Sequence, residues 1–544
     1  MPRLRLSLWI RRLFGVIAMV GLTSCAGNET PHEASTGELF ARGIEQITDL
    51  YIEPVSSQKL VLAGAKNLTK LDARLGVSMG GEVRDRDQLT LTYDGIPIAN
   101  YSVSQEVSAG SAGDLVAGLI GAAKKASGKI NAMPEEAIDK VLFDGMTGAL
   151  DRFSRYASPD EARDQRAARD GFGGIGITLE TGKNDFTVSA VSDEGPAARA
   201  GIKAGDKIVA VNGVTVAGRQ ASDIIHQLRG PIGSIVGLTI ERPGVAGTRD
   251  FKIERALVVV PTVTVTRDGN IAIFRIASFN QSTTERVTEG LIEVQRQAKG
   301  PLAGIILDLR GDPGGLLDQA VNLSDLFIAK GPIIATVGRH PASHQYFAAT
   351  GHSLAPSTPL VVLINGGSAS ASEIVAAALQ DVGRAVVVGT SSYGKGTVQT
   401  VMRLPNDGEL TLTWARLVTP SGYYLQEHGV VPTLCTSGLG DTDAAIDTVL
   451  QRPVDASDAD ASHPRGSLSD TAWSTLRHSC PAKTASSPLD LKIAERVLSD
   501  PARYSAALGA IRHGTTAAPS PQPPPGAAAL TARGGGLSSN PRTP

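Results

Sequence analysis

The amino-acid sequence predicts a multidomain α/β protein whose largest part is built on a largely parallel sheet. A chain of 544 residues is too long for one compact core and indicates about three domains. After Arg255, apolar runs with strand character alternate with helical patterns, which is typical of strand–helix units in a parallel sheet. Before this, from Gly171, short β-like runs broken by glycine indicate a smaller β-rich domain.

The composition argues against one class of partner. The chain is 42% hydrophobic and 19% charged, as in ordinary globular proteins, and its net charge is −2. A near-neutral chain gives no electrostatic reason to bind nucleic acid, and an aromatic content of 4% leaves few rings for stacking on bases. We therefore expect no nucleic-acid partner.

The N-terminus has the pattern of an export signal. Four arginines precede an apolar stretch at 13–22 that is too short to cross about 30 Å of hydrocarbon, which predicts a signal peptide over 1–24. The Leu-Thr-Ser-Cys run that ends at Cys25 resembles a bacterial lipobox. This resemblance implies cleavage before Cys25, acylation of its thiol, and a lipid-anchored protein in the bacterial cell envelope that faces the periplasm. A plain secretory signal with a chance cysteine is the alternative.

The two remaining cysteines are predicted to form a disulfide. Export places Cys435 and Cys480 in a setting that permits disulfides. No spacing rule connects them, so two buried free thiols remain the alternative.

A polar tether at 25–35 leads into a helical N-terminal region over 36–166. Apolar residues recur at helical spacing from Phe40 to Tyr51 and again from Ile138 to Leu150. An insert at about 65–130 separates them, with strand-like runs on either side of Asp94-Gly95, a hairpin signal, and a small-residue helical segment at 108–128. We assign the insert no function.

The predicted core extends over 257–434. Its expected elements alternate along the chain: a strand at 271–279, a helix around 287–294, a strand at 304–310, a helix at 316–327, a strand at 360–364, a helix after Ser370 and a strand at 385–388. A parallel sheet of this kind places its site at the carboxyl ends of the strands. A C-terminal extension at 435–513 shows two short helical stretches, and the Pro- and Gly-rich tail at 514–544 is predicted to be disordered.

A block of small residues at 365–373 is the best candidate for a nucleophile. An apolar strand leads into it and an Ala-rich helix leads out, so a serine at this junction exposes its hydroxyl near a helix N-terminus, where unpaired N–H groups favour negative charge. Ser368, Ser370 and Ser372 all meet this description. Chemistry alone does not choose among them.

A serine needs a base, and lysine fits this sequence better than histidine. We interpret His340, His344, His352 and His428 as surface residues, because no nucleophile or turn motif accompanies them. The sequence also lacks the paired His or Cys spacing of metal sites. Lys395 lies between two glycines after a buried-looking strand, and a buried lysine loses part of its preference for charge and can act as a base. If no other motif accompanied it, Lys395 would be interpreted as an ordinary solvated lysine in a turn.

Two sequence signatures resemble a PDZ domain over about 167–256. The first is the run Gly173, Gly174, Ile175, Gly176 and Ile177, and the second is the stretch at 196–213 that ends in Val-Asn-Gly. The resemblance implies that the glycine loop holds a peptide's terminal carboxylate and that a helix at 222–228 borders the groove, with the peptide added to the sheet edge.

Three motifs resemble those of the carboxyl-terminal processing (tail-specific) serine peptidases, over about 135–433. They are the runs at 368–373, at 393–399 and at 308–315. The resemblance implies an α/β, crotonase-like core with Ser370 as nucleophile, Lys395 as general base and Gln399 as the residue that orients the lysine. It further implies oxyanion donors at the backbone N–H groups of Ala371 and of one glycine of the Gly314-Gly315 pair, with Gly315 favoured, and no cofactor or metal.

The combined expectation is a serine endopeptidase that recognises protein or peptide substrates with free C-termini, with adaptor proteins or an oligomer as further partners. Two departures from the family are the insert at 65–130 and Asp312, which places a carboxyl group before the Pro-Gly-Gly turn. One alternative is an inactive PDZ-bearing scaffold. Another is thioester chemistry of the crotonase kind, which an exported location disfavours because acyl-CoA is not expected there.

Overall fold

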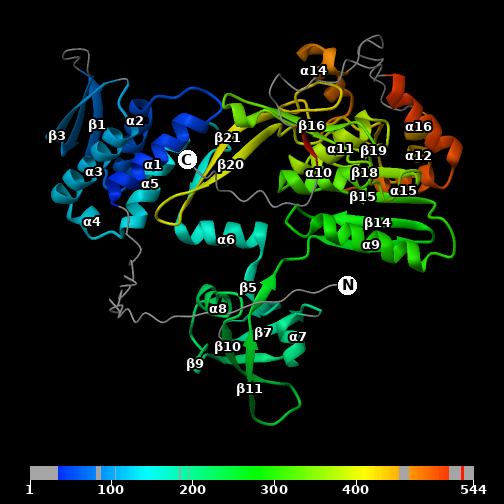
Figure 1. The fold of residues 1–544 in the computed structure, drawn as a ribbon, viewed down its shortest axis with the longest axis horizontal. Coiled ribbons are helices and arrows are strands. Elements are labelled where there is room, and N and C mark those ends of the chain that lie inside the picture. Colours follow the sequence, from blue (N-terminus) through cyan, green and yellow to red (C-terminus); the bar gives the residue numbers. More distant parts are fainter. Residues whose placement is uncertain are drawn as a thin grey trace, which may run out of the picture.

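The computed structural model describes residues 35–80, 87–104, 106–182, 185–193, 195–451, 465–513 and 529–531. The predicted signal peptide and Cys25 therefore lie outside the described residues. Figure 1 shows an N-terminal region, a small β domain and a larger α/β core arranged around helix α6 (Pro159–Asp170). Among the described helices, none is both long and apolar enough to cross a membrane.

The N-terminal region packs helices against one small sheet. Its elements are α1 (Thr36–Leu50), α2 (Ser57–Asn67), β1 (Leu75–Gly80), β2 (Asp87–Tyr93), β3 (Ile96–Val103), α3 (Ala109–Ala126), α4 (Gly128–Asn131) and α5 (Glu135–Gly148). The hairpin predicted at Asp94-Gly95 is confirmed, with both residues at positive φ between antiparallel β2 and β3. Helices α1 and α3 touch at Gly113, where a Cβ would lie 2.3 Å from the Gly37 carbonyl oxygen. The insert is thus part of this region's core.

The small β domain forms an antiparallel sheet in the order β11-β10-β8-β7-β6, with two helices. Its elements are β5 (Phe172–Gly174), β6 (Ile177–Thr181), β7 (Phe186–Val191), α7 (Pro196–Ala200), β8 (Lys207–Val211), β9 (Val214–Thr215), α8 (Ala221–Leu228), β10 (Ile235–Glu241), β11 (Thr248–Glu254) and β12 (Ala256–Val258). The chain enters through β5 and leaves through β12. These two strands pair with each other, apart from the domain's main sheet.

The core contains the predicted parallel sheet. Its order is β13-β14-β15-β18-β19-β22, and all neighbours are parallel except β13 and β14. The elements are β13 (Val263–Asp268), β14 (Ile271–Ile276), α9 (Thr283–Gln297), β15 (Gly304–Asp308), α10 (Leu317–Asp325), β18 (Leu360–Ile364), α11 (Ala371–Asp381), β19 (Val386–Gly389) and β22 (Leu434–Cys435). Every residue of β15, β18 and β19 is buried, because both faces of these strands are covered.

A second, largely antiparallel sheet was not predicted from the sequence. It consists of β4 (Arg155–Ala157), β16 (Pro332–Val337), β17 (Gln345–Ala348), β20 (Thr397–Arg403) and β21 (Glu409–Val418), and Ala529–Thr531 (β23) pairs in parallel with β17. The long β20–β21 hairpin, yellow in Figure 1, reaches from the core to the N-terminal region. There Leu404, Leu410 and Leu412 join the hydrophobic cluster of the N-terminal helices. The remainder of the predicted disordered tail lies outside the described residues.

The C-terminal extension holds more helix than the sequence indicated. Its helices are α12 (Asp443–Gln451), α14 (Asp470–Ser479), α15 (Pro488–Leu498) and α16 (Pro501–His513), of which only the last two were predicted. Cys435 on β22 and Cys480 after α14 form a disulfide bond across 45 residues of sequence.

Candidate active site

The serine block lies where β18 turns into α11. The buried strand Leu360–Ile364 ends at Asn365, and α11 begins at Ala371. Ser370, directly before the helix, has φ 56° and ψ −111°, a conformation that costs a non-glycine residue about 1–3 kcal/mol. Such strain persists only where surrounding contacts impose it.

The three candidate serines have different surroundings. Ser368 is fully buried, and its hydroxyl donates to the Leu309 carbonyl at 2.8 Å. Ser372 is also fully buried, and its hydroxyl donates to the Asp312 carbonyl at 3.0 Å. Ser370 is the one of the three that is partly exposed. Two of the serines thus hold the turn together, and Ser370 is accessible.

Lys395 lies in the turn between β19 and β20 and is half-buried. Burial, and then the nearby positive charge of Arg155, lower the pKa of the Lys395 ammonium group below its usual value. The Nζ atom also lies 5.0 Å from the centre of the Phe153 ring, a contact that partly favours the charged form. The direction of the shift moves Lys395 toward the neutral amine that can accept a proton.

A single buried carboxylate joins the serine turn to the lysine turn. Glu373 is fully buried on the first turn of α11. Its Oε2 accepts the backbone N–H of Ser370 at 2.8 Å and that of Lys395 at 2.9 Å, while Oε1 accepts the N–H of Gly394 at 2.6 Å and the Ser392 hydroxyl. Burial raises the pKa of Glu373, and these four hydrogen bonds oppose the rise. This role of Glu373 was not predicted from the sequence, although Ser-x-x-Glu before an apolar helix is a capping-box pattern that could have indicated it.

Two backbone N–H groups near Ser370 have no acceptor among the described residues. They belong to Ala371, at the start of α11, and to Gly315, in the turn after β15. The N–H of Gly314, by contrast, donates to Asp312 Oδ1 at 2.8 Å. A Cβ on Gly314 would lie 3.0 Å from the Cβ of Ser370, and its φ is +95°, so only glycine suits this approach. The free donor of Ala371 therefore directly follows the serine, and that of Gly315 directly follows the glycine that packs against the serine.

Gln399 and the histidines are held by other contacts. The Gln399 amide Nε2 donates to the hydroxyls of Thr397 and Thr413, which leaves Oε1 as its acceptor; no hydrogen bond joins Gln399 to Lys395 within the described residues. Of the four histidines predicted to lie at the surface, His352 is exposed and the other three are partly exposed. Each of those three, His340, His344 and His428, also forms a hydrogen bond with a nearby backbone group.

Within the described residues, no group of three or more His, Cys, Asp or Glu side chains could hold a metal ion.

The predicted carboxylate loop is only partly a loop. Gly173 and Gly174 belong to strand β5 and pair with β12, so the turn itself comprises Ile175 and Gly176, with β6 beginning at Ile177. The helix predicted at 222–228 is present as α8 (Ala221–Leu228). A cavity of about 440 Å³ lies between α8, Phe172 and α6, lined by Ile225 and His226 among others. Arg229 at the end of α8 borders it, paired with Asp164 of α6 at 2.7 Å.

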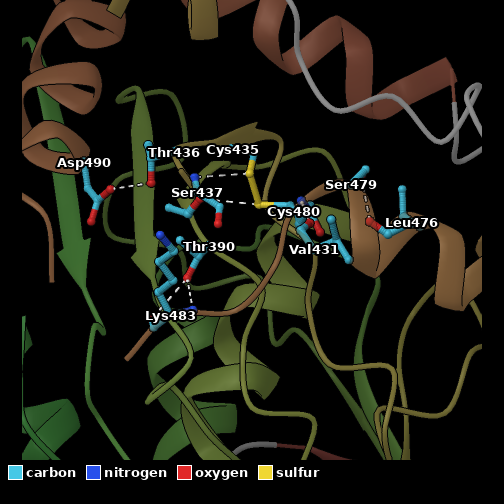
Figure 2. The surroundings of a disulfide bond; sticks show 12 residues. Thr390, Val431, Cys435, Thr436, Ser437, Leu476, Ser479, Cys480, Lys483 and Asp490 are labelled. Atoms are coloured by element: carbon cyan, nitrogen blue, oxygen red, sulfur yellow. Dashed lines mark hydrogen bonds between the residues drawn. A yellow bond between two sulfur atoms is a disulfide. The ribbon is translucent and has the colours of Figure 1, made fainter. Parts of the chain in front are cut away.

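A segment of the C-terminal extension, residues 480–487, contacts the turn before Ser370 and the loop that leads to Lys395; we call it the brace. Its Lys483 carbonyl accepts the N–H of Gly366 at 2.8 Å, and its Thr484 carbonyl accepts the Asn365 amide at 2.8 Å, which fixes the turn before Ser370. Figure 2 shows Thr390, on the path to Lys395, bonded to Lys483, with the disulfide above them. The disulfide thus fastens the start of the brace to β22.

The sequence comparisons identify the family. The model of peptidase family S41 matches residues 270–435, and a PDZ-domain model matches residues 187–242. A carboxy-terminal-processing protease of Bartonella bacilliformis is 41% identical over 294 residues, which cover 54% of this chain and 68% of the relative. The chain belongs to peptidase family S41. It is therefore an S41 serine peptidase with a PDZ domain, and its core has the α/β fold expected from the sequence.

Further relatives are similar to this S41 peptidase over the same share of the chain. The carboxy-terminal processing protease CtpA of Bacillus subtilis is 35% identical, over 54% of this chain and 63% of its own. The chloroplastic C-terminal processing peptidase of Tetradesmus obliquus is 33% identical, over 52% and 64%. The chain thus spans slightly under two thirds of these two relatives.

Among solved structures, the photosystem II D1 C-terminal processing protease is 30% identical to this chain. It has a TM-score of 0.33 and covers 54% of this chain and 81% of its own. A PDZ domain of a carboxy-terminal protease from Vibrio cholerae, solved with a peptide, is 27% identical with a TM-score of 0.16, over 16% of this chain and 98% of its own.

Proposed function

We propose that this S41 peptidase is a lipid-anchored endopeptidase of the bacterial cell envelope that cleaves proteins by a Ser370–Lys395 dyad. The observation that carries the proposal is the shared contact with Glu373, which accepts the backbone N–H groups of both residues and so holds the two turns together. The lowered pKa of Lys395 supports its role as a base, and the accessibility of Ser370 supports its role as the nucleophile.

The proposed reaction has two stages. Lys395 takes the proton of the Ser370 hydroxyl as the oxygen attacks the scissile carbonyl, and the N–H groups of Ala371 and Gly315 stabilise the oxyanion. The tetrahedral species then expels the amine, which receives the proton from Lys395, and leaves an acyl-enzyme. Water, deprotonated by Lys395, then attacks the acyl carbon. The ester bond to Ser370 breaks, its oxygen receives the proton from Lys395, and the new C-terminus leaves. Gln399, whose Oε1 is its remaining acceptor, would orient the lysine amine.

The first test compares wild-type protein with Ser370→Ala and Lys395→Ala on a denatured protein substrate. We expect both changes to lower kcat by at least about a thousandfold, because nucleophile and base act as a unit. Ser368→Ala is the matched control: it can destabilise the turn but should leave measurable cleavage. Undiminished cleavage by Ser370→Ala would refute the dyad, and loss of cleavage only in Ser368→Ala would assign the nucleophile to Ser368.

The PDZ domain is proposed to capture substrate C-termini at the turn formed by Ile175 and Gly176, next to the α8 groove. A substrate with an amidated C-terminus lacks the carboxylate charge and should be cut several-fold more slowly than the free acid, through a higher KM. Equal rates would count against carboxylate capture.

The lipid anchor is tested separately, because Cys25 lies outside the described residues. Mass spectrometry of the membrane fraction should find a diacylglyceryl group on Cys25, and Cys25→Ser should move the protein to the soluble fraction. An unmodified Cys25 in membrane-bound protein would contradict the proposal.

A further inference from the structure

Asp312 is a fully buried acidic residue in the turn after β15, beside the proposed oxyanion donors. Its Oδ1 accepts the N–H of Gly314 at 2.8 Å. Its Oδ2 is buried and has no hydrogen-bond partner among the described residues. An ionised carboxylate with an unpaired buried oxygen is costly, whereas a neutral carboxyl group tolerates this surrounding better.

The same residue joins the two halves of the proposed oxyanion hole. The backbone carbonyl of Asp312 accepts the N–H of Ala369 at 3.0 Å and the hydroxyl of Ser372 at 3.0 Å. The side chain meanwhile fixes Gly314, directly before Gly315. The two donors are Ala371 on α11 and Gly315 on the turn. Asp312 bonds to the neighbour of each, Ser372 and Gly314, and so sets the spacing between the donors.

The groups that face Asp312 come from three elements. Arg275 on β14 favours the ionised form, but its guanidinium already pairs with Asp308 at 2.9 Å. From α11 the facing group is the Ser372 hydroxyl, and from the turn itself it is the Gly314 N–H. Glu373, the nearby acid on α11, directs its oxygens to the residues around Lys395. Burial outweighs these contacts and raises the pKa of Asp312 to about 7.

We propose that Asp312 is a positioning residue of the oxyanion hole that works in its uncharged form, so that loss of its proton lowers peptidase activity. The inference rests on the proposed function, in which negative charge develops at the adjacent N–H groups. A carboxylate at this place would repel the forming oxyanion in a site of low dielectric, while a neutral carboxyl still accepts the Gly314 hydrogen bond.

The decisive readout is the pH profile of Asp312→Asn, which keeps the Oδ1 acceptor and cannot ionise. In wild type, the uncharged fraction of Asp312 falls about tenfold per pH unit above its pKa, which offsets the gain from deprotonating Lys395. Asp312→Asn stays uncharged at every pH and therefore does not lose activity in this way. The ratio of kcat/KM at pH 9 to kcat/KM at pH 7 should therefore be at least about tenfold larger in Asp312→Asn than in wild type.

The matched control is Asp381→Asn. Asp381 is also buried with its pKa raised by burial, and its Oδ1 also has no partner within the described residues, but it lies at the far end of α11. This variant should keep the wild-type ratio. An equal ratio in wild type and Asp312→Asn would overturn the proposal, as would the same increase in Asp381→Asn.

A stability measurement gives a second readout that does not depend on activity. Because the folded-state pKa of Asp312 lies above its value of 3.8 in an unfolded chain, its contribution to stability is full below that value and is lost as the pH rises through about 7. The free energy of unfolding should therefore fall less between pH 5 and pH 8 in Asp312→Asn than in wild type, and an identical fall would contradict the inference.

Asp312→Ser, another uncharged acceptor, replaces Asp312→Asn if the latter does not fold. Failure of both neutral variants to fold would show that the charge is required and would also overturn the proposal. The Ser370→Ala protein separates this inference from the proposed function: if it still cleaves, the dyad is wrong, whereas an inactive Ser370→Ala with unchanged pH profiles for Asp312→Asn refutes only the role of Asp312.

Discussion

Glu373 shows how one side chain can place two reactive groups that are 25 positions apart in sequence. A carboxylate is a pure acceptor, so its two oxygens can receive all four hydrogens that surround it: those of the Ser370, Gly394 and Lys395 amides and of the Ser392 hydroxyl. Because the side chain is fully buried, water cannot replace any of these bonds. The strained backbone of Ser370 is one end of this network.

Glu373→Gln tests the network at the level of a single atom. The amide NH₂ would face backbone N–H groups that need an acceptor, and each unsatisfied buried donor costs about 1–3 kcal/mol. We expect kcat to fall at least tenfold with KM little changed, since the substrate does not contact Glu373. Steady-state kinetics check this, with Asp381→Asn as the control on the same helix. An unchanged kcat would show that the turns hold their places without the carboxylate.

At the scale of secondary structure, the brace connects the C-terminal extension to the segments that carry the proposed dyad. Residues 480–487 contact the turn that precedes Ser370 and the loop that precedes Lys395, and α15 beyond them packs on the parallel sheet. Arg310 adds an ion pair to Asp490 and a hydrogen bond to the Ser487 carbonyl. The extension therefore packs as part of the core, although the peptidase family model ends at residue 435.

Removing the disulfide tests the brace. A crosslink that closes a loop of 45 residues stabilises a protein by about 4 kcal/mol in the chain-entropy model. The double variant Cys435→Ser/Cys480→Ser should melt at a lower temperature and lose several-fold in kcat, because the brace can move away from both turns. Reductant should reproduce this in wild type and have no effect on the double variant. Full activity of the double variant would mean that the brace holds without the disulfide.

The sequence predicts the parallel elements well because buried strands have continuous apolar runs, as in Leu360–Ile364. Helix α14 was missed because only Trp473 and Leu476 of its residues are buried, which is too few for a periodic pattern. The β20–β21 hairpin was missed although Asp407 and Gly408 form a turn signal between its strands.

The candidate dyad came from motif resemblance. Its contacts with Glu373 and the brace could not be predicted, because they join segments that only the folded chain brings together. The difference among the three serines also depends on such contacts. The Ser368 hydroxyl donates to the Leu309 carbonyl, directly after β15, and the Ser372 hydroxyl donates to the Asp312 carbonyl in the following turn.

Across the whole molecule, α6 is the helix that joins the N-terminal region, the core and the PDZ domain (Figure 1). Arg166 and Arg169 of α6 pair with Glu409 of β21, whose side chain is 4% exposed. On the other side, Asp164 pairs with Arg229 of α8. Removing the buried Glu409 charge would leave two arginines uncompensated, whereas the pair of Arg229 with the exposed Asp164 is worth little, so the contact with the core is the more costly one to break.

Glu409→Gln should therefore release α6. Leaving two arginines without their charged acceptor costs about 3–5 kcal/mol locally, so amide hydrogen exchange over 159–170 should rise by at least tenfold while exchange in β10 and β11 stays unchanged. Asp407→Asn is the matched control on the same hairpin, because its ion pair with Arg403 is exposed on both sides and worth less than about 1 kcal/mol. Equal exchange in the two variants would contradict this assignment.

The pairing of β5 with β12 brings together the two ends of the small β domain, which affects how the protein can evolve. Because Gly174 lies opposite Ala256 in their register, the chain leaves the core and returns to it at a single place. A short linker between these two positions would close the core without the 81 residues between them, 175–255. A different domain inserted at the same junction would leave the other sheets of the structure unchanged. The small β domain is thus an insertion whose two ends meet at a pair of opposed residues, so recombination at these two positions would exchange it as one unit.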